Sequence, residues 1–323
     1  MQPQKKIILI SLVTGILLMI AKFVAFFVTS SNSILTDASE SIVNVLASAF
    51  AFYSIYLSAL PRDQNHPYGH GKVEFFAVFF EGALIALAGL LIILKSAYNL
   101  IHPQTIRALL DGTIIIASTG LINFLLGSYM VRQSKQLNSL TLYADGKHLL
   151  TDAYSSAALV GGLILIYLTG IYYLDSIFSI GLGFFILYHG YKLVRKSVGG
   201  LMDESDMEKL SEVVGILNDN RKETWIDVHN LRTQIYGPEL HIDCHITLPY
   251  YFDLNKVHEE VTEVSNLVNN KSNNKTEFFI HADPCLPECC HYCRMSHCPV
   301  RNEAKRKDVA WTLENVTLNQ KHF

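Results

Sequence analysis

The sequence predicts a membrane protein in two parts: an all-α bundle of six transmembrane helices, followed by a cytoplasmic α+β domain. Of its 323 residues, 50% are hydrophobic and only 17% are charged. The apolar residues gather in the first 200 positions, in runs that reach the length of about 20 residues that a helix needs to cross a bilayer. We expect a transmembrane domain at 1–200, a cytoplasmic domain at 201–284 and a Cys-rich tail at 285–323.

Each transmembrane segment is an apolar run with few charges. The first follows Lys5 and Lys6 and lacks a small-residue cleavage pattern, so we interpret it as a span and not as a cleaved signal peptide. The six segments lie at about 6–29, 32–58, 73–98, 109–132, 142–168 and 172–194.

Basic residues predict the orientation. They cluster at the amino terminus and after even-numbered segments, whereas the other side offers little beyond Lys95 and Arg107. The clustered residues are Lys5, Lys6, Arg62, Lys72, Arg132, Lys135, Arg195 and Lys196. By the positive-inside rule both termini are cytoplasmic, and we expect an integral protein of the bacterial inner (plasma) membrane. The cysteines then face a reducing compartment, which favours metal ligands or free thiols over disulfides.

The part after Ser205 reads as a small two-layer domain of order αββαβ. Apolar residues at helical spacing, alternating apolar residues and a Gly237-Pro238 turn predict its elements. These are a helix at 205–220, strands at 225–236 and 239–248, a helix at 254–268 and a strand at 276–282. We expect the tail after it to add no large core.

Ionisable residues inside two apolar segments are the strongest sign of function. Asp37, Glu40 and Asn44 share one helix face, and His148 and Asp152 lie one turn apart on another helix. A carboxylate at the bilayer centre costs about 2.5–3.5 kcal/mol, so such residues need partners or a ligand. Glu40, Asn44, His148 and Asp152 could bind a divalent ion tetrahedrally, with Asp37 either coordinating or orienting a neighbour. The alternative is that they only hydrogen-bond the helices together.

Three further groups carry metal-binding residue types. Asp63, His66 and His70 lie in a loop that Gly69 and Gly71 allow to turn tightly, although loop histidines are more often solvated. The cytoplasmic domain holds His229, His241, His245, His258, His281 and Asp283. The tail holds Cys285, Cys289, Cys290, Cys293 and Cys298, with His291 and His297 between them. This spacing is typical of a soft-metal site, with redox-active or simply reduced thiols as the alternative.

Three motifs resemble the cation diffusion facilitator (cation efflux) family: Ser33-Ile-Leu-Thr-Asp-Ala38, the loop His66-Pro-Tyr-Gly-His-Gly-Lys72, and His148-x-x-x-Asp152. The resemblance runs from the first segment to about Pro284. It implies a homodimeric antiporter of divalent cations and protons, a secondary transporter and not an enzyme. Its transport site lies between the second and fifth segments, and its cytoplasmic domain is metallochaperone-like (ferredoxin-like).

The resemblance also implies roles for individual residues. Glu40 and Asn44 occupy the places where the family commonly has Asp or His and then Asp, and Asp63, His66 and His70 match a loop metal site of some bacterial members. His229, His245, His258, His281 and Asp283 match a zinc region of the cytoplasmic domain at the dimer interface. Lys72 and Asp203 match a charge pair between the membrane and soluble parts.

The transport site departs from the family pattern, because Asn44 is neutral and Glu40 is longer than Asp. We expect weaker electrostatic holding and altered selectivity. His148 favours zinc, iron(II) or cobalt over manganese, and we rank Zn²⁺ first and Fe²⁺ second, both as substrate and as regulatory ligand. The expected partners are a second copy of the chain, the lipid bilayer, metal ions and protons, but no nucleic acid. The alternative is a membrane-anchored metal sensor that does not transport.

Overall fold

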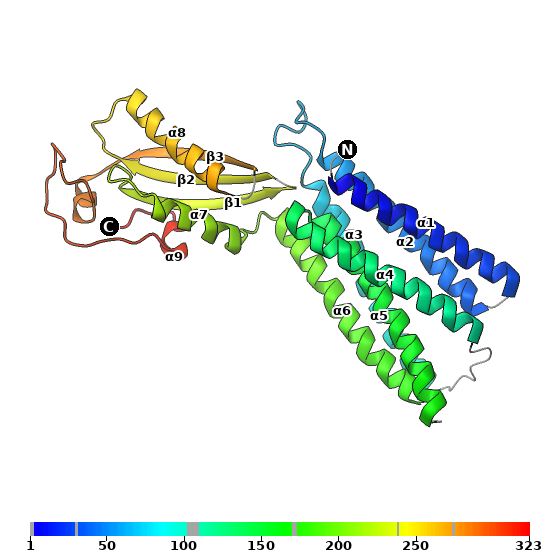
Figure 1. The fold of residues 1–323 in the computed structure, drawn as a ribbon. Helices are drawn as coiled ribbons and strands as arrows, with labels where there is room; N and C mark the ends of the chain where they lie inside the picture. Colours follow the sequence, from blue (N-terminus) through cyan, green and yellow to red (C-terminus); the bar gives the residue numbers. More distant parts are fainter. Residues whose placement is uncertain (1–2, 30–31, 102–109, 170–172, 238, 273–274) are drawn as a thin grey trace. The chain divides into compact units, whose positions relative to one another are not determined.

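The computed structural model describes residues 3–29, 32–101, 110–169, 173–237, 239–272 and 275–323 (Figure 1). The chain divides into two compact units, residues 1–201 and 202–323. Each unit has its own buried apolar clusters, so each is described by itself.

The first unit is a bundle of six long helices. They are α1 (Pro3–Thr29), α2 (Asn32–Ser58), α3 (Val73–Ile101), α4 (Leu110–Leu137), α5 (Leu140–Thr169) and α6 (Tyr173–Leu201). The most extensive packing joins α3 to α6, α4 to α5 and α1 to α2. Glycines permit the closest approach: a Cβ on Gly190 of α6 would lie 2.5 Å from the backbone nitrogen of Ala86 on α3. Small residues at helix contacts are typical of membrane bundles.

The first unit buries polar side chains and exposes apolar ones. Glu81, Asp145 and His148 are buried within it, whereas Leu17, Leu91 and Leu125 are more than half exposed. A water-soluble bundle shows the opposite distribution, so this surface suits contact with lipid. Among the described residues, two helical stretches, Pro3–Val24 and Val73–Ile101, are long and apolar enough by composition alone to span a membrane.

The second unit has the predicted αββαβ order. Its elements are α7 (Met207–Asp219), β1 (Asp227–Tyr236), β2 (Glu239–Leu248), α8 (Leu254–Lys271) and β3 (Lys275–Pro284), followed by a 3₁₀ turn (Pro287–His291) and the short α9 (Leu313–Val316). The sheet order is β1-β2-β3, antiparallel between β1 and β2 and parallel between β2 and β3. Asp206 and Asp253 cap α7 and α8 by accepting backbone N–H bonds.

The tail, for which the sequence predicted no large core, contributes two buried residues to the core of the second unit. Trp311 and Val316 are buried in the same apolar cluster as α7, α8 and the sheet. The guanidinium of Arg221 lies 3.9 Å from the centre of the Trp311 ring and donates to the carbonyls of Val309 and Ile226, both at 2.7 Å. The cation–π contact with Trp311 and the charge-assisted hydrogen bond to Val309 therefore hold the tail against the domain, and the bond to Ile226 fixes the guanidinium in place.

Candidate metal sites

Asn44 on α2 meets His148 and Asp152 on α5. The Asn44 amide nitrogen donates to Asp152 Oδ2 at 2.7 Å, and its oxygen lies 3.0 Å from His148 Nε2. His148 Nε2 and Asp152 Oδ2 are 3.9 Å apart, and the two side chains are 8% and 19% exposed. One nitrogen and two oxygens of the predicted transport site thus converge between two helices.

The His148 ring has one nitrogen engaged and one free. Its buried Nδ1 has no hydrogen-bond partner among the described residues, while Nε2 faces Asn44 and Asp152. A metal bound at Nε2 would replace the Asn44–His148 contact, and Asn44 could then coordinate only through Oδ1. These three side chains form a compact polar site in which a proton and a cation could compete for His148.

The remaining transport-site candidates lie on the first half of α2. This helix runs through Asp37 and Glu40, and a step of four residues puts Glu40 on the same face as Asn44. The side chains of Asp37 and Glu40 lie outside the described part of the chain, so their ligand roles stay predictions.

Two further acidic residues, Asp145 and Glu81, are buried near His148, and the sequence motifs assigned them no role. Asp145 is 0% exposed and accepts hydrogen bonds from Ser11 of α1 at 2.7 Å and Ser48 of α2 at 2.8 Å. Glu81 of α3 is 1% exposed and interacts with Asp145. Both acids lie within apolar segments, and this feature of the sequence could have marked them as functional candidates.

The loop residues Asp63, His66 and His70 lie together between α2 and α3. Asp63 Oδ1 is 3.1 Å from His66 Nδ1, and Asp63 Oδ2 is 3.3 Å from His70 Nε2. The backbone N–H of His66, at 2.7 Å, is the main influence that lowers the pKa of Asp63. Gly69, at φ +90°, makes the turn that brings His70 back. The three side chains could bind one cation.

Three histidines form a row across the sheet of the second unit. His229, His245 and His281 are direct neighbours in register on β1, β2 and β3. Asp283 joins them: its Oδ2 lies 3.3 Å from His229 Nε2 and 3.4 Å from His245 Nδ1, and its Oδ1 lies 3.4 Å from His281 Nε2. His229, His245 and Asp283 are close enough to share one ion.

Burial shapes the chemistry of this site. It lowers the pKa of His229, although nearby Asp227 and Asp283 oppose the shift, so the ring stays neutral and can coordinate near pH 7. The chain leaves the regular ladder just after His229, where Asn230 has φ +53°. Such a bulge re-aims side chains at the end of a strand.

Two predicted members of this region lie elsewhere. His258 is exposed on α8 and does not join the group within one chain. His241 is buried on β2, and its Nδ1 is 3.4 Å from Glu277 of β3.

The end of the chain supplies neighbours of this site that the sequence did not predict. Lys321 Nζ lies 3.9 Å from Asp283 Oδ2, and His322 contacts the buried Asp227, both by its backbone N–H at 3.1 Å and by its ring. Asp227 in turn is 4.0 Å from His229. The tail folds back against β1 and β3, and such a long-range contact produces no periodic pattern in the sequence.

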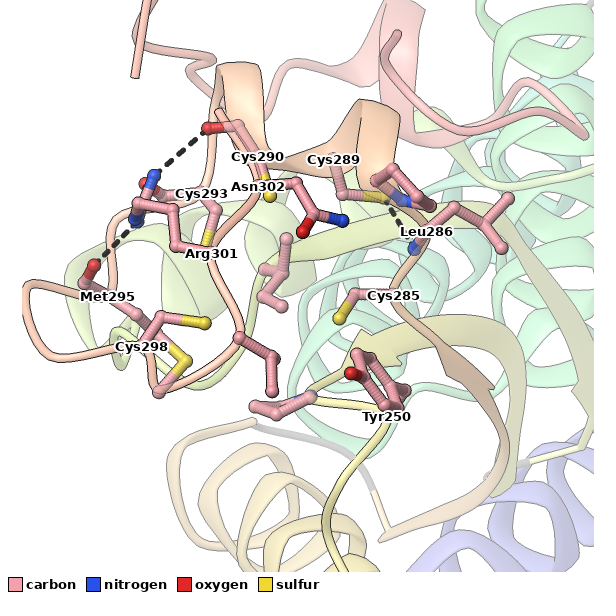
Figure 2. A pocket seen from close by; sticks show the side chains of 14 residues that line it. Tyr250, Cys285, Leu286, Cys289, Cys290, Cys293, Met295, Cys298, Arg301 and Asn302 are labelled. Carbon is pink, nitrogen blue, oxygen red and sulfur yellow. Dashed lines mark hydrogen bonds between the residues drawn. The ribbon is translucent and has the colours of Figure 1, made fainter. Parts of the chain in front are cut away.

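The predicted tail cysteines line one pocket of about 210 Å³ (Figure 2). All five line it, together with mainly apolar residues. The predicted charge pair Lys72–Asp203 joins residues of the two different units and stays a prediction.

A bundle with an apolar surface that places a histidine and a carboxylate of α5 against an amide of α2, followed by a domain with its own His/Asp site, defines a class of metal-handling membrane proteins. A model described as the cation efflux transmembrane domain matches residues 8–202, and one described as the cytoplasmic domain of cation efflux proteins matches residues 206–285. The chain belongs to the cation diffusion facilitator (cation efflux) family, whose members are integral to the membrane.

Relatives cover most of the chain. An uncharacterized transporter of Synechocystis is 31% identical over 74% of this chain and 77% of its own length. An uncharacterized transporter of Methanocaldococcus jannaschii is 27% identical over 88% and 99%. The cation-efflux pump FieF of Shewanella oneidensis is 26% identical over 85% and 92%. The cytoplasmic-domain match ends at residue 285, so nearly all of the Cys-rich tail lies beyond the two family models.

Proposed function

We propose that this protein exports a divalent cation from the cytoplasm in exchange for protons, with zinc as the first substrate and iron(II) as the next. The observation that carries the proposal is the convergence of Asn44, His148 and Asp152 between α2 and α5, inside a bundle with an apolar surface. Mixed imidazole and oxygen ligands suit zinc and iron(II) better than manganese.

The proposed topology has six spans with both termini in the cytoplasm. Each of the six helices has 27 to 30 residues. At a rise of 1.5 Å per residue they are roughly 40 Å long, enough to cross a hydrocarbon core of about 30 Å with some tilt. The distribution of Lys and Arg residues supports this orientation.

The transport cycle is alternating access around a fixed site. Metal enters from the cytosol, displaces the proton of His148 and separates the Asn44 amide from Asp152, and Glu40 completes the ligand set. After the bundle reopens outward, a proton returns to His148 and weakens its hold on the metal. Exchange at one ring nitrogen couples the two ions without a separate proton channel.

The cytoplasmic domain binds zinc as a regulatory ligand and forms a homodimer with a second copy. His229, His245 and Asp283 are the metal ligands that its geometry favours, with His281 beside them. His258, exposed on α8, is available to a site that the second copy completes.

Proton flux in sealed proteoliposomes tests the transport proposal. His148→Ala and Asp152→Ala should each abolish zinc-driven proton movement. His189→Ala is the matched control and should retain it, because His189 lies on α6 and its ring contacts the Phe185 carbonyl of its own helix. Zinc binding without vectorial uptake by the wild type would instead identify a membrane-anchored sensor.

A further inference from the structure

The tail after β3 folds into a pocket whose soft-metal donors are cysteine thiols. Five of the six cysteines of the chain line it (Figure 2). No carboxylate or imidazole is among its described lining residues, which otherwise include Ile226, Pro249, Leu286 and Val300. Such a donor set differs from the His/Asp groups elsewhere in the chain and suits soft, thiophilic cations.

One of the five thiols is committed to packing. Cys289 is buried, and its Sγ accepts hydrogen bonds from the Leu286 N–H and the Tyr292 hydroxyl, both at 3.4 Å. Its sulfur turns toward the Leu286 N–H in Figure 2. Four thiols remain, which is the number that a tetrahedral structural zinc site needs.

The four remaining thiols line the same pocket although they come from different segments. Cys285 follows β3 directly, and its N–H donates to the carbonyl of Leu248 on β2 at 2.9 Å. Its thiol interacts electrostatically with those of Cys289, Cys293 and Cys298, and Cys293 interacts in turn with Cys298 and Cys290. The sheet therefore positions one ligand and the tail the other three.

Arg301 holds the tail segment in shape. Its guanidinium donates to the carbonyl oxygens of Cys290 at 3.2 Å, Cys293 at 3.3 Å and Met295 at 2.6 Å. A zinc ion with four thiolates carries two net negative charges, which this cation partly offsets. Arg301 thus holds the backbone of the loop through hydrogen bonds and makes it electrostatically suited to a thiolate site.

We propose that the tail binds one soft divalent cation, with zinc as the cellular occupant, through Cys285, Cys290, Cys293 and Cys298. No three thiols yet lie within 4.8 Å of one another among the described residues. Because sulfurs around one zinc ion are about 3.8 Å apart, binding must draw the loop inward. Metal therefore fastens the tail to the end of the sheet, two residues beyond Asp283. The site does not depend on transport.

Cobalt(II) titration of the reduced, purified full-length protein tests the site. Thiolate-to-cobalt charge-transfer absorption reports sulfur ligands and ignores the His/Asp sites. We expect the band to saturate at a single cobalt per chain, to vanish when zinc is added, and to be lost in Cys290→Ser/Cys293→Ser. His148→Ala should keep it, which separates this site from the proposed transport function.

Two matched cysteine variants control for folding. Cys289→Ser changes the committed thiol in the same pocket, and Cys244→Ser changes a thiol buried in the domain core. Both should retain the full band. Absence of the band in the reduced wild type, its persistence in Cys290→Ser/Cys293→Ser, or equal loss in Cys244→Ser would each overturn the proposal.

Discussion

Asn44 connects His148 and Asp152 through the two ends of a single amide. Its nitrogen donates to the carboxylate and its oxygen faces the imidazole, so the neutral side chain satisfies both neighbours when no metal is bound. A carboxylate at this position would instead repel Asp152 in the empty site. The amide therefore stabilises the empty arrangement, and we predict that it lowers the cation affinity relative to a carboxylate.

Asn44→Asp should strengthen metal binding, because two carboxylates in contact need a cation or a proton between them. We expect roughly a tenfold lower half-saturating zinc concentration, equivalent to about 1.4 kcal/mol. Uptake by proteoliposomes at varied zinc and manganese concentrations measures this change. Asn44→Ala, which removes the amide without adding charge, is the control. An unchanged zinc profile in the Asp variant would mean that position 44 does not ligate.

Substitution of Asp145 should lower the free energy of unfolding, an effect that can be measured without a transport assay. Asp145→Ala leaves the hydroxyls of Ser11 and Ser48 without their buried acceptor, and the cost of such a loss is about 1–3 kcal/mol. Asp145→Asn keeps one acceptor oxygen and should lose less. Thermal unfolding in detergent compares the two variants, and equal midpoints would show that these hydrogen bonds contribute little.

The spacing of His148 and Asp152 in the sequence predicts that they lie side by side, because positions four apart share a helix face. It could not predict that Glu81 of α3 faces Asp145 of α5, since the rotation of one helix against another depends on packing. Close contacts at Gly82, Gly89 and Gly190 are part of that packing. Sequence pattern thus identifies the ionisable residues of each helix, and tertiary structure selects their partners.

At the scale of elements, the close contact of α3 with α6 depends on glycines. In Gly190→Val a Cβ would meet the Ala86 backbone nitrogen at 2.5 Å and force the helices apart. We expect a loss of about 1–3 kcal/mol from overpacking. Gly181→Val on the same helix is the control, because no described atom lies within 4 Å of a Cβ there. Similar melting temperatures for the two variants would contradict this packing.

The histidine row across β1, β2 and β3 predicts a pH dependence of zinc binding. Burial lowers the pKa of His229 below its usual value near 6.5, so this ring needs no deprotonation at pH 7. Acidification to well below pH 6.5 protonates His229 and removes it as a ligand, so the zinc affinity should fall there. Calorimetric zinc titration of the wild type and His229→Ala at several pH values measures the difference in zinc affinity that is due to this site. A difference that grows on acidification would contradict the assignment.

The strands show what alternation alone can predict. The second strand, expected at 239–248, is β2 (Glu239–Leu248), because its apolar side chains alternate without a break. The tail shows the opposite case. Its attachment depends on a few isolated contacts, such as the hydrogen bond of 2.6 Å from Asn218 to the Trp311 carbonyl. Such contacts have no sequence period, so the core contributed by the tail could not be predicted.

At the scale of the whole molecule, the tail has two separable roles. Trp311 and Val316 complete the core of the cytoplasmic unit, whereas the cysteines form the proposed metal site. Removing residues 285–323 therefore removes both at once. Truncation of a buried Trp to Ala alone costs about 3–5 kcal/mol, a large part of the stability of a small domain.

Deleting 285–323 should consequently expose the cytoplasmic unit to limited proteolysis at any zinc concentration. Cys290→Ser/Cys293→Ser keeps the buried Trp311 and should stay protected, but without the extra protection of the tail that zinc gives the wild type. Fragment patterns from the full-length protein in detergent, with and without zinc, measure both effects. A truncated protein as resistant as the wild type would show that the tail is dispensable for folding. Equal sensitivity of the cysteine variant and the deletion would show that the two roles cannot be separated.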